Sequence, residues 1–159
     1  MVKILIIYDS ETGHTEKMAW AVAEGAQSIN GVEVIVKKID KAKVEDLLEA
    51  DGIIIGSPTY FGQMSAKIKA FIDESIKVYG KLEGKVGAAF TSSGGTATGA
   101  ETTLLSIIEA MLVHGMIVQG RAEDKHYGAA AVEEPDEEAM EHCRELGRRT
   151  AILAKKLKG

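Results

Sequence analysis

Short apolar runs alternate with longer stretches of helical periodicity along the chain. Five runs have the length and the β-branched content of strands: Val2–Tyr8, Val32–Ile39, Gly52–Ser57, Lys85–Ser92 and Met116–Gln119. Near-continuous apolar strands that alternate with helices are typical of a parallel sheet covered on both faces. The pattern therefore predicts an α/β fold of three layers.

Apolar residues at helical spacing define the helices between and after these runs. A helix over Thr15–Ile29 is expected to bury Met18, Val22, Ala26 and Ile29. A helix over Glu101–Leu112 is expected to bury Leu104, Ile108, Met111 and Leu112. Ser65 is the expected N-cap of a helix over Ala66–Ile76. The last helix is expected to have Pro135 at its first position, lysines in its last turn, and a core face of Met140, Cys143, Gly147, Thr150, Ala154 and Leu157.

Length and composition restrict the class of protein. A chain of 159 residues without a repeat or linker predicts one domain over residues 1–159. A net charge of −5 gives no electrostatic support for nucleic-acid binding. The longest apolar runs are far shorter than the roughly 20 residues that cross a bilayer, so no membrane insertion is expected. The single cysteine, Cys143, excludes an internal disulfide, and no leader is evident, so a cytoplasmic location is expected.

Glycine is frequent while proline and aromatic residues are scarce. The chain has 17 Gly, 2 Pro and 1 Trp, 4 Tyr and 3 Phe. Glycine at this frequency indicates places where the backbone approaches another group closely. No Cys, His or acidic spacing resembles a metal site, and no metal is expected.

The loop after the first predicted strand leads directly into a helix and has the composition of an anion site. It contains Ser10, Glu11, Thr12, Gly13, His14 and Thr15. Hydroxyls and unpaired backbone N–H groups at a helix N-terminus favour a phosphate. The absence of Lys and Arg within the loop suits a phosphomonoester better than a triphosphate. The alternative is an ordinary N-cap in which Thr12 or Thr15 accepts the free N–H groups.

Two further loops follow the third and fourth predicted strands, at the edge where ligands bind in open α/β sheets. The first offers adjacent aromatics that suit a flat apolar ligand, and a glycine that allows close approach: Pro58, Thr59, Tyr60, Phe61 and Gly62. The second offers hydroxyls and exposed amides for the polar edge of a ring: Ser92, Ser93, Gly94 and Gly95.

The order of elements and these loops resemble the flavodoxin-like proteins, and more closely the WrbA-like NAD(P)H:quinone oxidoreductases. The most specific segments are Ser10–Thr15, Pro58–Ser65, His114–Met116 and Tyr127–Ala129. The resemblance implies a five-stranded parallel sheet of order 2-1-3-4-5 that binds FMN. It implies phosphate at Ser10–Thr15, the ring bordered by the loop at residues 58–62, and ribityl and pyrimidine groups at residues 92–95. It further implies a cofactor contact at His114 and a quinone contact at Tyr79 beside Tyr60.

Departures from the WrbA-like pattern leave two functions open. The segment that those enzymes insert after the second strand is missing, because Asp40–Asp51 fills the gap in about a dozen residues. Thr12 stands where they have an aromatic, and Val113 replaces the first histidine of a pair. The preferred hypothesis is an enzyme that passes two electrons from NAD(P)H through FMN to a quinone. The alternative is a flavodoxin-type one-electron carrier between redox partner proteins.

Several single residues have an expected position or role. His114 either caps a helix end or contacts the flavin, and His126 is a candidate to reach the flavin of a neighbouring copy. His142 is expected at the surface and Cys143 in the core. Trp20 lies opposite the apolar stripe of its helix, which predicts a subunit interface in a homo-oligomer, a dimer or tetramer. The acidic run over residues 121–145 is interpreted as a solvated loop and helix start rather than a docking surface.

Overall fold

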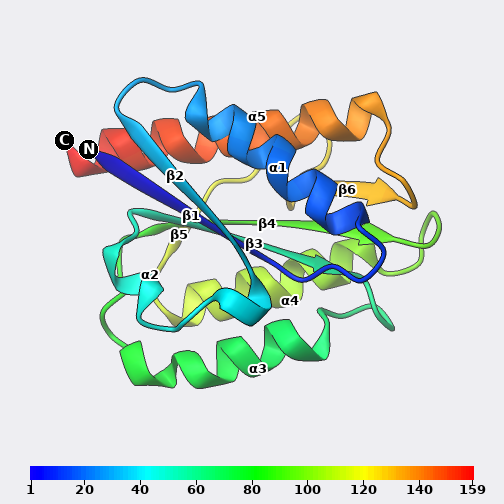
Figure 1. The fold of residues 1–159 in the computed structure, drawn as a ribbon, viewed down its shortest axis with the longest axis horizontal. Helices are drawn as coiled ribbons and strands as arrows, with labels where there is room; N and C mark the ends of the chain where they lie inside the picture. The colour runs from blue at the N-terminus through cyan, green and yellow to red at the C-terminus, as the bar shows by residue number, and fades with distance from the viewer.

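A parallel sheet is the middle layer of the computed structural model, which describes residues 1–159 (Figure 1). Its strand order is β2-β1-β3-β4-β5, as predicted. The strands are β1 (Val2–Tyr8), β2 (Val32–Lys38), β3 (Gly52–Pro58), β4 (Val86–Ser93) and β5 (Ile117–Val118). All of them point toward the same edge, so the loops that follow β1, β3 and β4 meet there.

The sheet has a sixth strand that the hydrophobic pattern did not predict. β6 (Ala129–Val132) pairs in parallel with the second half of β4, whereas β5 pairs only with Val86 and Gly87 at its start. The position beside β4 is therefore shared by two short strands joined by residues 119–128. β6 consists of three alanines and a valine, so it lacks the β-branched content by which strands are recognised.

Helices cover both faces of the sheet. On one face lie α1 (His14–Gln27) and α5 (Glu137–Lys158), and on the other lie α2 (Asp46–Glu49), α3 (Ala66–Glu74) and α4 (Ala100–Val113) (Figure 1). Two 3-10 turns, Ile39–Lys41 and Ser75–Val78, follow β2 and α3. The chain ends lie side by side at the edge from which the strands start. None of these helices combines the length and the apolar character needed to cross a bilayer.

The side chains of alternate strand residues enter two separate cores. Ile4, Ile6 and Ile54 pack under α1 and α5, whereas Leu5 and Ile53 pack with α2, α3 and α4. Successive side chains of a strand point to opposite faces, so a strand buried on both faces must be apolar at every position. This explains the unbroken apolar runs in the sequence.

Several predicted helix details need correction. Pro135 was expected at the first position of α5, but the helix begins at Glu137 and Pro135 lies before it. Asp136 is the N-cap, and its carboxylate accepts a hydrogen bond from the Ala139 N–H at 2.8 Å. On α4 the buried face is centred on Ile107, which leaves Leu112 exposed, and Leu157 in the last turn of α5 is exposed as well. The expected cap at Ser65 and the buried position of Cys143 are confirmed.

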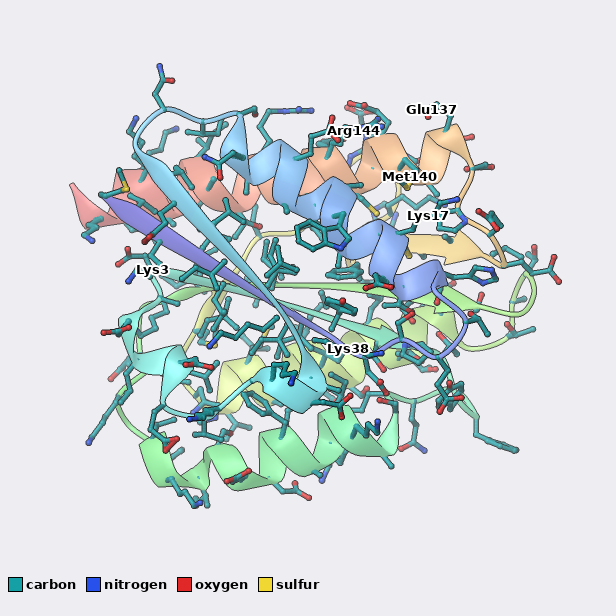
Figure 2. All side chains as sticks on the ribbon, in the orientation of Figure 1. Lys3, Lys17, Lys38, Glu137, Met140 and Arg144 are labelled. Atoms are coloured by element: carbon teal, nitrogen blue, oxygen red, sulfur yellow. The ribbon has the colours of Figure 1, made fainter.

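α1 and α5 approach each other through glycine. A Cβ atom on Gly147 would lie 1.9 Å from the carbonyl oxygen of Val22, and one on Gly25 would lie 1.8 Å from that of Arg144. Beside this contact Arg144 pairs with Glu137 on its own helix at 3.0 Å and with Glu24 on α1 at 3.3 Å (Figure 2). The backbones of the two helices are thus in direct contact, and an added methyl group has no space.

We expect Gly147→Ala to destabilise the fold by about 2–4 kcal/mol, because the new Cβ forces α1 and α5 apart. Urea unfolding measures the change. Gly120→Ala is the matched control, since a Cβ there meets its nearest atom, the His126 carbonyl oxygen, at 3.6 Å. Equal stability of the two variants would contradict the proposed packing.

Candidate functional site

The loop between β1 and α1 presents a series of unpaired backbone donors. Gly13 lies at the N-cap with φ 92°, and no side chain caps the helix. The N–H groups of Glu11, Thr12, His14 and Thr15 donate no hydrogen bond within the chain. The capping alternative for Thr12 and Thr15 is therefore wrong, and the free N–H groups at the positive end of α1 suit a phosphate.

Two internal hydrogen bonds fix the shape of this loop. The Ser10 hydroxyl accepts from the Gly13 N–H at 3.1 Å, and the buried Thr15 and Ser92 hydroxyls are 2.7 Å apart. The second contact ties the start of α1 to the end of β4. The Ser92 hydroxyl thus has one partner inside the protein, and its expected contact with a ligand stays a prediction.

The loop after β3 forms a tight hairpin with two exposed aromatics. Tyr60 and Gln63 exchange backbone hydrogen bonds of 2.9 and 3.0 Å, and Phe61 and Gly62 between them have φ of 52° and 75°. Two central residues with positive φ are typical of a type I′ turn. Phe61 is fully exposed and Tyr60 is 40% exposed. The turn therefore presents ring faces to solvent at the edge where the strands end.

The hairpin is held against the loop between β4 and α4. The Thr102 hydroxyl donates to the Gly62 carbonyl at 2.6 Å, and a Cβ on Gly99 would lie 2.5 Å from the Gly62 Cα. The two loops thus touch backbone to backbone. Of the Gly62 peptide groups, only the N–H remains without a partner in the chain. Sequence reasoning did not identify Thr102, because its role depends on a contact 40 positions away.

The loop after β4 offers amides rather than hydroxyls. The Ser93 hydroxyl donates to the Gly95 carbonyl at 3.0 Å, so it is also used inside the protein. The N–H groups of Gly94 and Gly95 have no partner in the chain, and no atom lies within 4 Å of a Cβ position on Gly94. Of the four residues predicted here, Gly94 and Gly95 offer backbone N–H groups without a partner in the chain, and a ligand contact at Ser92 and Ser93 stays a prediction.

Acidic side chains surround the first two loops. Burial raises the pKa of Tyr60, and the nearby carboxylates of Glu11 and Asp9 raise it further. Burial and a 2.7 Å hydrogen bond to Glu16 raise the pKa of Tyr8 to about 12. Both phenols therefore stay protonated at neutral pH and act as neutral groups.

Two predicted site residues lie elsewhere. Tyr79 follows the 3-10 turn Ser75–Val78 that continues α3, His114 follows α4, and their rings are 6.0 Å apart. Both helices start at the ligand edge and run back, and the 14 residues of α4 span about 20 Å (Figure 1). Within one chain, Tyr79 and His114 are therefore at the opposite edge of the sheet from the three loops. His114 occupies the C-cap position of α4, but its ring bonds to the Ser75 hydroxyl and to no carbonyl of the helix end, so neither expected role of the ring is shown.

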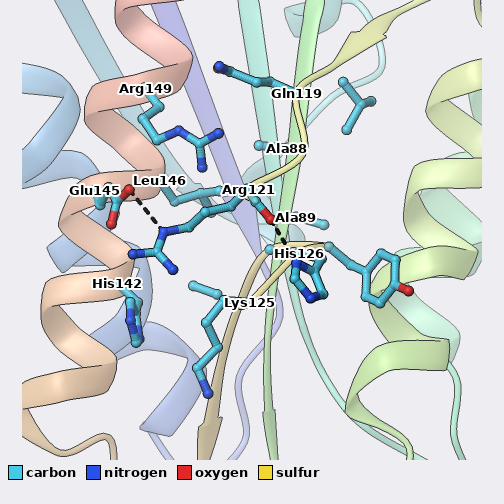
Figure 3. A pocket seen from close by; sticks show the side chains of 14 residues that line it. Ala88, Ala89, Gln119, Arg121, Lys125, His126, His142, Glu145, Leu146 and Arg149 are labelled. Atoms are coloured by element: carbon cyan, nitrogen blue, oxygen red, sulfur yellow. Dashed lines mark hydrogen bonds and ion pairs between the residues drawn. The ribbon is translucent and has the colours of Figure 1, made fainter. Parts of the chain in front are cut away.

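A polar cleft between α5 and residues 119–128 is separate from the three loops (Figure 3). Arg121 pairs with Glu145 at 3.0 Å, and Nδ1 of His126 is 2.8 Å from the Arg121 carbonyl oxygen. The cavity volume is about 20 Å³, room for about one water. The cleft is therefore too small for a flavin. His142 lines it and is half-buried rather than at the surface as expected.

The three loops fit a flavin mononucleotide on their own chemistry. Free N–H groups at the start of α1 suit its phosphate, the exposed aromatics suit the face of its ring, and the amides of Gly62, Gly94 and Gly95 suit its polar ring edge. Pro58 and Thr59 connect these parts: Pro58 ends β3, and the Thr59 N–H donates to the Ser92 carbonyl at 2.8 Å.

Comparisons with known proteins agree with this geometry. The profile of the family described as NADPH-dependent FMN reductase matches residues 37–123. A protein of Aquifex aeolicus named flavodoxin is 45% identical over 95% of this chain and 86% of its own length. A protein of Archaeoglobus fulgidus named NAD(P)H dehydrogenase (quinone) is 38% identical over 99% of this chain and 100% of its own length. The crystal structure of a flavodoxin, a WrbA-like protein from Agrobacterium tumefaciens, superimposes with a TM-score of 0.85 at 30% identity, covering 98% of this chain and 99% of that one.

His114 makes the stability of the protein depend on pH. The Ser75 hydroxyl donates to the Ile72 carbonyl at 2.6 Å and so accepts from Nε2 of His114 at 2.8 Å. This leaves Nδ1 buried as a lone pair without a donor, and burial lowers the pKa of His114 from its ordinary value of 6.5. Because the folded-state pKa is the lower one, the stabilisation is complete above pH 6.5 and is lost as the pH falls below it.

We therefore expect the free energy of unfolding to fall more steeply in the native protein than in His114→Gln when the pH is lowered from 7.5 to 5. Urea unfolding at several pH values gives the comparison, and the difference between the two proteins removes the contribution of the other histidines. Parallel pH profiles would show that His114 does not titrate in this range.

Proposed function

The chain belongs to the NADPH-dependent FMN reductase family and has the flavodoxin-like fold, and we propose that it transfers two electrons from NAD(P)H through FMN to a quinone. The observation that carries the proposal is the set of unpaired backbone donors on three loops joined by hydrogen bonds. The names of several relatives support the reaction, since three of them are called NAD(P)H dehydrogenase (quinone).

The α1 start binds the phosphate in this proposal. Residues 10–15 surround it with N–H groups and hydroxyls, and the dipole of a 14-residue helix favours its negative charge. Gly13 gives the loop its left-handed turn without a side chain that obstructs the anion, since nothing lies within 4 Å of its Cβ position. His14 contributes its backbone N–H whatever its ring does.

The other two loops position the ring and adjust its electronics. FMN, when bound, supplies the hydride acceptance and electron release, and no side chain acts as acid or nucleophile. The Gly62 N–H has no partner in the chain and would donate to a ring nitrogen, while Thr102 holds the Gly62 carbonyl. The N–H groups of Gly94 and Gly95 stabilise negative charge on the pyrimidine edge. Phe61 and Tyr60 border an open face where flat substrates stack.

The proposal includes a dimer or tetramer. Tyr79 is 59% exposed at the far edge, so it can border this site only from a second copy. Trp20 is 56% exposed on α1, and a subunit contact would cover it. His126, which is exposed in the β5–β6 connection, retains its proposed role toward a neighbouring flavin on the same condition.

One observation favours the alternative of a one-electron carrier. The exposed Glu11 and the buried Asp9 lie near Tyr60 and give the ligand edge a negative potential, which suits docking of a basic redox protein. The relative named flavodoxin is consistent with that function. The two functions differ in whether a nicotinamide reduces the bound flavin directly.

Anaerobic mixing of the FMN-loaded protein with NADH or NADPH tests the proposal. We expect the flavin absorbance to bleach within seconds and to return when a benzoquinone is added, because hydride and quinone use the same open face. Failure to bleach within minutes with either nicotinamide, together with two well-separated one-electron potentials in a redox titration, would contradict the enzyme and establish the carrier.

A further inference from the structure

Glu134 is fixed in the turn between β6 and α5. On one side, the Glu133 N–H donates to the Ser93 carbonyl at 2.7 Å, and Glu133 has a φ of 54°. On the other side, Asp136 caps α5. The turn thus holds Glu134 next to the end of β4 and in front of α1.

The Glu134 carboxylate contacts the two basic side chains at the start of α1. It accepts a hydrogen bond from Nζ of Lys17, and its other oxygen lies 3.9 Å from Nε2 of His14. The Lys17 hydrogen bond and charge lower the pKa of Glu134, so it is ionised at neutral pH. Lys17 stands on the first turns of α1, facing the β6 end of the sheet (Figure 2).

These two basic residues are the ones nearest to the proposed phosphate position along the chain. His14 and Lys17 are the only basic residues between Asp9 and Gln27, and His14 belongs to the phosphate loop itself. A dianionic phosphate monoester would attract both. With Glu134 in place, the positive charge of Lys17 is already neutralised, and the carboxylate itself repels the phosphate.

We propose that Glu134 is a specificity-determining residue of the flavin site, which withholds Lys17 and His14 from the phosphate and so limits the preference for FMN over riboflavin. This inference rests on the proposed function, because it takes the loop of residues 10–15 as the phosphate site. Glu134 acts through charge alone: it contacts no proposed ring position and is exposed, so its replacement leaves the fold intact.

The test compares dissociation constants for FMN and riboflavin, measured by quenching of flavin fluorescence. We expect Glu134→Gln to bind FMN about fivefold more tightly at low salt, because the released Lys17 ammonium can then face the phosphate, and one contact between unit charges in water has about this effect. Riboflavin, which lacks the phosphate, should bind as it does to the native protein. The FMN gain should shrink in about 1 M salt.

Two variants separate this mechanism from other effects. Glu133→Gln removes the same charge from the neighbouring position, which has no ion pair, and should change FMN affinity less than twofold. In a Lys17→Gln background, Glu134→Gln should lose most of its effect, because the cation that it releases is gone.

Equal or weaker FMN binding by Glu134→Gln, or a parallel gain for riboflavin, would overturn the inference. It would leave the proposed function in place as long as the native protein binds FMN. Absence of saturable binding of both flavins by the native protein would instead overturn the proposed function.

Discussion

The site depends on the parallel register of β1, β3 and β4. Tyr8 is level with Gly56, and Gly56 with Phe90, so the three strands reach the same edge together. Gly56 makes this register possible, since a Cβ there would lie 2.1 Å from the ring of Phe90, the largest fully buried side chain. Three loops that are distant in sequence therefore begin at the same edge of the sheet, and their unpaired backbone N–H groups lie close together.

Buried hydroxyls keep those amides in place. Thr15 with Ser92, and Thr59 with Thr91, form hydrogen bonds of 2.7 Å between neighbouring loops and strands. Each of these hydrogen bonds contributes only modestly to stability, but removing one hydroxyl would leave the other without a partner, which is destabilising where it is buried. These hydroxyl pairs stabilise the scaffold, and the backbone N–H groups without partners remain available to a ligand.

The periodicity of the sequence was sufficient for the fold class and for the location of the three loops after the strands, and the resemblance to flavodoxin-like proteins supplied the strand order. The sequence was insufficient for the internal partners of the hydroxyls, since the bonds of Ser92 with Thr15 and of Ser93 with Gly95 appear only in the folded chain. Tyr79 and His114 were assigned by resemblance, although a helix that starts at the ligand edge must end at the other one. Nothing in the sequence around Glu134 indicates its ion pair, since its partner Lys17 is 117 positions away.

The central claim, that the three loops form one flavin site, is tested most directly by amide NMR spectra recorded during titration with FMN. The account predicts that the perturbed N–H signals belong to residues 11–15, 60–62 and 94–99, while those of Gly31 and Gly52, at the edge from which the strands start, stay unchanged. Perturbations centred on the cleft of Arg121 and His126, or spread evenly over the sheet, would contradict it.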